Sequence, residues 1–171
     1  KAALDEVGVY TTDRSRQPPE DYELWSRIAR RFRIANLPER LTIYREVSTS
    51  MSREGIDPFT EKLLLITAEN LAVASTGELS PQSIHFDIAC LIHGMPEKMS
   101  RNADIESMCA VISKVGAAIL GAAQVDRDHD LAATWNQNLR HHFTIYKLGL
   151  RPARNVGSVI KRSLRRLGFS I

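Results

Sequence analysis

Proline and glycine divide this chain of 171 residues into segments of helical length, and this feature restricts its fold more than any other. Asp57-Pro58 and Ser80-Pro81 each place a capping side chain before a proline, which is tolerated at the first helical position. Glycines that can end a helix follow the apolar patterns at Gly55, Gly77, Gly94 and Gly149. No segment alternates apolar and polar residues with period two, so the sequence predicts an all-α fold with little or no sheet.

Apolar residues recur at spacings of three and four through most of the chain, which is the pattern of amphipathic helices. The pattern predicts six main helices, at about residues 20–33, 41–51, 59–74, 82–93, 103–123 and 128–146. Asn102 is the expected N-cap of the fifth helix, and Ser158 is the expected cap of a short terminal helix. We therefore predict a compact bundle of about six helices over residues 1–149, followed by a basic C-terminal arm over residues 150–171.

Charge is distributed very unevenly along the chain, although the net charge is only +3. No aspartate or glutamate follows Asp130, and the eight lysines and arginines beyond it give residues 131–171 a charge of +8. Residues 14–53 carry nine arginines against five acids, whereas residues 54–130 carry twelve acids against five bases. Of the 23 positive residues 17 are arginines, whose guanidinium group suits bidentate binding of phosphate or carboxylate. A base-composition bias of the genome would also produce this excess of arginine.

The first predicted helix combines an apolar stripe with a cluster of arginines. Its apolar residues fall three and four apart, at Tyr22, Trp25, Ile28, Ala29 and Phe32. Four arginines lie between and beyond them, at Arg27, Arg30, Arg31 and Arg33. We expect the stripe to be buried and the arginines to form a basic ridge beside it, with their charged heads in water. On this interpretation the arginines contribute to the binding of a polyanion more than to folding.

The C-terminal arm is predicted to act between subunits. Residues 150–157 are typical of an extended linker, and the short helix after it has a narrow apolar face of Ile160, Leu164 and Leu167. Because a helix of about ten residues is marginal alone in water, we expect the arm to dock on a core, its own or a neighbour's, while its cations face an acidic polymer. An anionic membrane surface and a solvated terminal helix are the alternatives.

The sequence contains no complete motif for catalysis or for binding a metal or cofactor, so we assign no such residues. The acidic run 126–130 lacks the glycine and the glutamate of a calcium loop. His85 and Asp87 stand two apart on one predicted helix and point away from each other, so they cannot share an ion. A pair formed by His85 and His129 stays open.

These features favour a structural protein that binds the backbone of nucleic acids without reading their sequence and self-assembles through its terminal arms, in the manner of a nucleoprotein or coat subunit. The acidic stretch 54–130 would offer a face for the basic arm of an adjacent subunit. RNA is favoured over DNA as the ligand. The expected nucleic-acid-binding residues are Arg27, Arg30, Arg31, Arg33, Arg140, Arg151, Arg154, Lys161, Arg162, Arg165 and Arg166.

Two other classes of protein stay open. A protein-interaction module, such as an adaptor, effector or regulator, would use the basic tail to bind an acidic partner. A helical hydrolase with a cryptic site would need a pocket into which His85, His129 or the acidic run converges.

The sequence also carries expectations about the environment of the chain. No apolar run is long enough to span a membrane. Cys90 and Cys109 lie in apolar helical patterns, which favours free thiols in a reducing, intracellular compartment, either the cytoplasm or the interior of a virion. The chain starts at Lys1 and shows no signal-peptide pattern, so we expect a trimmed or partial chain.

Overall fold

The computed structural model of the chain describes residues 1–34, 37, 39, 41–43, 57–123 and 131–147, and these residues contain helices and no strand. The fold class is all-α, as predicted. In chain order the helices are α1 (Ala2–Val7), α2 (Glu20–Ala29), α3 (Asp57–Thr76), α4 (Ser83–Ile92), the 3-10 helix η1 (Pro96–Lys98), α5 (Ile105–Ala123) and α6 (Leu131–Lys147). None of these helices combines the length and the apolar character needed to cross a membrane.

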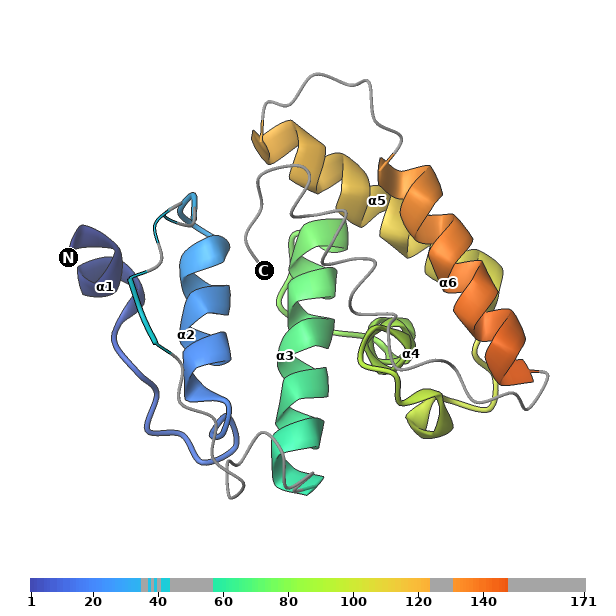
Figure 1. The fold of residues 1–171 in the computed structure, drawn as a ribbon, viewed down its shortest axis with the longest axis horizontal. Coiled ribbons are helices and arrows are strands. Elements are labelled where there is room, and N and C mark those ends of the chain that lie inside the picture. Colours follow the sequence, from blue (N-terminus) through green and yellow to red (C-terminus); the bar gives the residue numbers. More distant parts are fainter. Residues whose placement is uncertain (35–36, 38, 40, 44–56, 124–130, 148–171) are drawn as a thin grey trace.

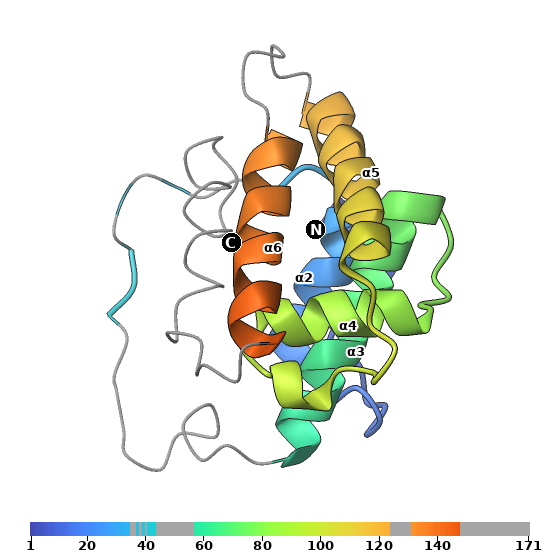
Figure 2. The ribbon, with the colours of Figure 1, turned by 90° about the vertical axis from the view of Figure 1, so that its right-hand side faces the viewer.

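The helix α3 stands at the centre of the arrangement (Figure 1). The N-terminal helices lie on one side of it, with α2 packed against α3 and α1 packed on α2. On the other side α4 and α5 contact α3, and α6 packs along α5 and against α4 (Figure 2). The N-terminal pair is thus attached to the flank of a bundle formed by α3, α4, α5 and α6.

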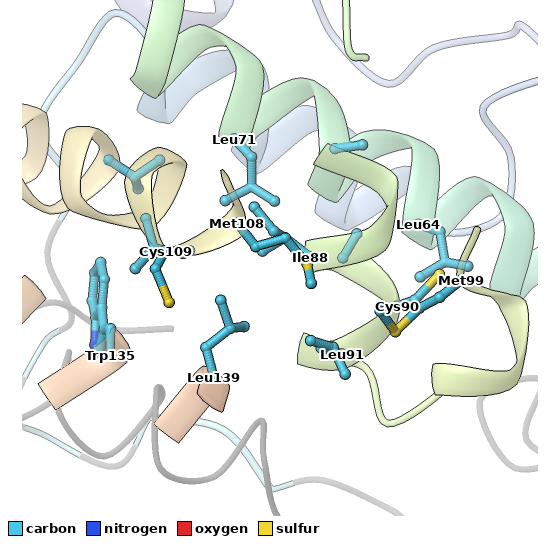
Figure 3. Packing of buried hydrophobic residues seen from close by; sticks show 14 residues of the cluster. Leu64, Leu71, Ile88, Cys90, Leu91, Met99, Met108, Cys109, Trp135 and Leu139 are labelled. Atoms are coloured by element: carbon cyan, nitrogen blue, oxygen red, sulfur yellow. The ribbon is translucent and has the colours of Figure 1, made fainter. Parts of the chain in front are cut away.

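The main apolar core joins the four helices of this bundle (Figure 3). Leu71 of α3, Ile88 of α4 and Met108 of α5 meet in its middle, and Ile88 and Met108 are fully buried. Trp135 and Leu139, one turn apart on α6, close the cluster from the side of that helix. Full burial of an apolar side chain of this size contributes about 2–3 kcal/mol to stability. The core therefore fixes the positions of α3, α4, α5 and α6.

Four predicted helices are confirmed with shifts of a few residues at their ends, as α3, α4, α5 and α6. Gly77 and Gly94 follow α3 and α4 with positive φ angles of 81° and 71°, the left-handed conformation that glycine adopts without strain. The expected start of the sixth helix at residues 128–130, the closing Gly149 and the whole arm lie outside the described residues.

Two predicted caps are wrong. The N-cap of α4 is Gln82 rather than Ser80, because the Gln82 N–H finds an acceptor in Nδ1 of His85 at 2.9 Å. At the start of α5 the carboxylate of Asp104, not Asn102, accepts the N–H groups of Ser107 at 2.9 Å and Glu106 at 3.4 Å. A negative charge is favoured at that position by the helix dipole, which an asparagine cannot match.

The N-terminal region differs most from the prediction. The helix α1 was not predicted at all, and α2 ends at Ala29, with Arg30 as its C-cap, instead of continuing to Arg33. Of the helix predicted at residues 41–51, residues 41–43 are described and are not helical, and the remainder lies outside the described residues.

Candidate polyanion-binding surface

The arginines of α2 point toward carboxylates of the same chain. Arg27 donates from Nε to the carboxylate of Glu23 at 2.8 Å and from Nη2 to the Val9 carbonyl at 2.7 Å, and its Nη1 donates to the Val7 carbonyl. Arg30 donates from Nε to Oδ1 of Asn70 at 3.0 Å. Both guanidinium groups are largely removed from water.

Glu69 is the centre of the contact between α2 and α3. This residue is only 4% exposed, yet its two carboxylate oxygens accept a bidentate pair of hydrogen bonds from Arg16, at 2.7 and 2.9 Å. The hydrogen bond with Glu69 raises the pKa of Arg16. The Nη2 group of Arg30 lies 3.4 Å from the same carboxylate. Two arginines from the N-terminal region therefore share one buried acid on α3.

Neutral side chains extend this polar contact along both helices. The Asn70 amide, which accepts from Arg30, donates to Oγ of Ser26 at 2.8 Å. One turn earlier the Tyr22 hydroxyl lies 3.2 Å from Oγ1 of Thr67. The side of α2 that faces α3 is thus hydrogen-bonded along its length, and Leu24 is the only buried apolar residue of α2.

The expected orientation of α2 is wrong in consequence. Trp25 is 56% exposed, Ala29 is exposed, and Ile28 and Phe32 are only half-buried, so the apolar stripe faces outward. The heads of Arg27 and Arg30 do not lie in water beside a buried stripe, because the buried carboxylates bind them. Charge-assisted hydrogen bonds to an acid that would otherwise be unpaired decide which side of α2 faces the bundle.

The other predicted nucleic-acid-binding residues are scattered. Arg31 is 60% exposed and pairs with Glu6 at 3.2 Å, while Arg33 is exposed and forms no ion pair with the residues described. Arg140 lies on α6, on the opposite side of α3 from α2 (Figure 1), and pairs with the exposed Glu106. The expected residues of the arm lie outside the described part of the chain, namely Arg151, Arg154, Lys161, Arg162, Arg165 and Arg166.

The acidic stretch 54–130 is not one continuous acidic face. Glu69 is buried under the arginines, and Asp87 is buried and accepts hydrogen bonds from the N–H and the hydroxyl of Ser100, at 2.7 and 2.6 Å. Glu106 is paired with Arg140, which lowers the pKa of the Glu106 carboxyl. The exposed acids of the described stretch are Glu61, Glu78, Glu97, Asp104 and Glu106.

His85 has a fixed and unreactive proton arrangement. Its Nδ1 accepts the Gln82 N–H, so the proton of the neutral ring is on Nε2, which lies 3.2 Å from Oγ of Ser75. The Ser75 hydroxyl donates to the Leu71 carbonyl at 2.8 Å. His85 therefore cannot take the proton of Ser75, and this pair is not a nucleophile with its base.

His85 and Asp87 bind partners on different elements, Ser75 and Ser100, which agrees with the prediction that their side chains point away from each other. His129 lies outside the described residues, so its pairing with His85 stays untested. Within the described ranges no three His, Cys, Asp or Glu side chains are grouped to hold a metal ion.

The protonation of His85 is expected to make the fold sensitive to acid. Burial lowers the pKa of His85 in the folded chain, while in the unfolded chain it stays near about 6.5. The unfolded state therefore binds the proton more readily, so stability is complete above about pH 6.5 and falls as the pH drops below it. We expect the urea midpoint, followed by circular dichroism, to be lower at about pH 5.5 than at about pH 7.5.

The variant His85→Asn serves as its control, because the amide oxygen can still accept the Gln82 N–H but does not titrate. Burial also lowers the pKa of His142, so part of the acid effect is expected to remain in this variant. An acid-induced fall of the same size in the wild type and in His85→Asn would contradict the assignment to His85.

Both cysteines are buried and free, as the sequence predicted. Burial raises the pKa of the Cys90 thiol to about 11, and it also raises the pKa of Cys109. A thiol that stays protonated at neutral pH is a poor nucleophile, so neither residue has the properties of a catalytic cysteine.

Glu69 and Asn70 are the polar pair that sequence reasoning missed. They stand between Ile66 and Leu71 in the middle of a mostly apolar helix, and such an interruption was the available signal.

Comparisons of the whole chain with protein-family models, with curated proteins and with solved structures found no match.

Proposed function

We propose that this chain binds the phosphate backbone of nucleic acids without reading the base sequence, as a structural subunit that self-assembles. One observation carries the proposal: residues 131–171 hold eight positive side chains and no acid. A segment of this kind has no acidic side chains to neutralise its charge. When it binds a polyanion, its positive side chains release the counterions that are condensed on that polyanion. RNA is the ligand that we propose first.

The arginines of the described N-terminal region fall into two groups, one paired with buried carboxylates and one at the surface. Arg16 and Arg30 pair with the buried Glu69 of α3, while Arg27 pairs with the buried Glu23 within α2 and donates to the Val9 carbonyl. We therefore propose that Arg27 and Arg30 act in folding, and that Arg31, Arg33 and Arg140 add to binding from the surface. The principal contacts would come from the arm, through Arg151, Arg154, Lys161, Arg162, Arg165 and Arg166.

The dependence of binding on salt tests this function. With nuclease-treated protein and fluorescent single-stranded RNA, we expect the logarithm of the affinity to fall steeply with the logarithm of the salt concentration, with a slope of about −4 or steeper. Two RNAs of equal length and unrelated sequence should bind with affinities that agree within a few-fold. Fluorescence anisotropy between about 50 and 300 mM salt gives both numbers.

A flat salt dependence or a strong sequence preference would overturn the proposal. Absence of RNA binding together with a saturable complex of fixed stoichiometry with an acidic protein would favour the second candidate, a protein-interaction module that uses the same basic arm.

A further inference from the structure

The outward side of α2 is an apolar surface on a helix whose polar side is already occupied. Tyr22, Ser26 and Arg30 are hydrogen-bonded to α3, and Glu23 and Arg27 are joined to each other and to the segment that follows α1. At 100° per residue these two sets leave one arc of the helix. Leu24, at one edge of that arc, is buried, and the other residues of the arc are Trp25, Ile28 and Ala29. Together with Phe32, just beyond the last turn, these three residues form the α2 outer face.

The α2 outer face has the composition of a protein interface. A tryptophan that is 56% exposed stands at its centre, beside the small side chain of Ala29, which allows a second helix to approach closely. Tryptophan is strongly enriched among the residues that dominate binding energy when they become buried. The apolar core of the bundle includes no residue of α2, so burying this face would not disturb that core.

The charges at the two ends of α2 are opposite in sign. Asp21 is exposed in the first turn, next to Glu20, and neither forms an ion pair within the described part of the chain. Arg31 and Arg33 are exposed just beyond the last turn, and only Arg31 has a described partner, Glu6. A surface that is acidic at one end, apolar in the middle and basic at the other is complementary to itself in antiparallel orientation.

We propose that the α2 outer face is the contact surface for a second copy of this chain, related by a twofold axis. The axis would pass near the midpoint between Trp25 and Ile28. Asp21 lies in the first turn of α2, and Phe32 and Arg33 follow its last turn, so in antiparallel orientation Asp21 of each copy lies toward the end that carries Phe32 and Arg33 in the other. The antiparallel helix dipoles add to the attraction. The proposal does not depend on nucleic-acid binding.

Sedimentation velocity of the nuclease-treated full chain tests the proposal. We expect a concentration-dependent dimer whose dissociation constant rises roughly tenfold or more in Trp25→Ala. Glu78→Lys, at an exposed residue between α3 and α4, is the matched surface control and should leave the dissociation constant unchanged. A wild type that is monomeric at every concentration, or a dimer unaffected by Trp25→Ala, would overturn it.

Charge reversal tests the antiparallel geometry. Asp21→Lys and Arg33→Glu each place like charges opposite one another, so each should weaken the dimer several-fold. The double variant restores opposite charges across the twofold axis, and its affinity should return toward that of the wild type. Circular dichroism melts of all three check that α2 remains folded. Additive weakening in the double variant would contradict the pairing.

Tryptophan fluorescence identifies what covers the face. The chain has two tryptophans, and Trp135 is buried, so a Trp135→Phe variant that still folds reports on Trp25 alone. Acrylamide quenching should be strong in dilute solution and weaker at concentrations where the dimer forms. Protection of Trp25 in a monomer would show that another segment of the same chain covers the face, which would overturn the proposal.

Discussion

Replacing Glu69 by glutamine is expected to lower the free energy of unfolding by about 2–3 kcal/mol. Arg16 and Arg30 then keep their charges at the contact between α2 and α3 without the carboxylate that neutralises them. Breaking a fully buried ion pair costs about 3–5 kcal/mol, and the effect here is smaller because both arginine side chains are partly exposed, at 27% and 17%. Urea denaturation followed by circular dichroism measures the loss.

Glu106→Gln is the matched control for this measurement. Glu106 also binds an arginine, Arg140, but both side chains lie at the surface, where ion pairs contribute little. The urea midpoint of Glu106→Gln should therefore stay close to that of the wild type. Equal midpoints for Glu69→Gln and Glu106→Gln would show that the shared carboxylate of Glu69 does not hold α2 in place.

Removing residues 150–171 is expected to reduce the affinity for RNA at least about a hundredfold at low salt. The deletion takes away six of the eight positive side chains that follow Asp130, and on a single strand each lost phosphate contact lowers the salt slope by roughly 0.7. Within the described part of the chain, the bundle and the segments between its helices already form a buried core cluster, so we expect the shortened chain to fold. Anisotropy titrations with RNA, next to a urea titration, give both results.

A full-length variant with the same six residues changed to glutamine separates charge from docking. It should lose RNA affinity to the same extent but keep any contact that the apolar residues of the arm make with a neighbouring subunit. Unaltered RNA binding by both variants would remove the arm from the proposed function. An unfolded truncated chain would instead place the arm in the core of its own domain.

The bundle was predictable because its signals are local. The apolar spacing of α3, α4, α5 and α6 and the glycines after α3 and α4 each lie within one segment of sequence. The caps of α4 and α5 were missed by two residues each, because several polar side chains compete at each start and hydrogen bonds such as that of Gln82 to His85 decide between them.

The orientation of α2 could not be predicted in the same way. Its helix has an arc of arginines and an arc of apolar residues, and either can face a neighbour. The deciding group, Glu69, stands 39 residues from Arg30 and 53 from Arg16 in the sequence. Periodicity within one helix carries no information about a carboxylate on another. The short α1 was missed because six residues are too few to show a period, and its end is joined to α2 by donors on Arg27.

The hydrogen-bonded contact between α2 and α3 also differs from the apolar core in how exposure to water affects its stability. Separating two apolar surfaces exposes both to water, which costs free energy. Each guanidinium, carboxylate and amide at the contact between α2 and α3 instead regains a hydrogen-bond partner from the solvent when the contact separates. We therefore expect a shift of the first 34 residues against the bundle to cost less free energy than a shift of a helix inside the bundle. High salt would favour such a shift, and the partly exposed pairs of Arg16 and Arg30 are where it would begin.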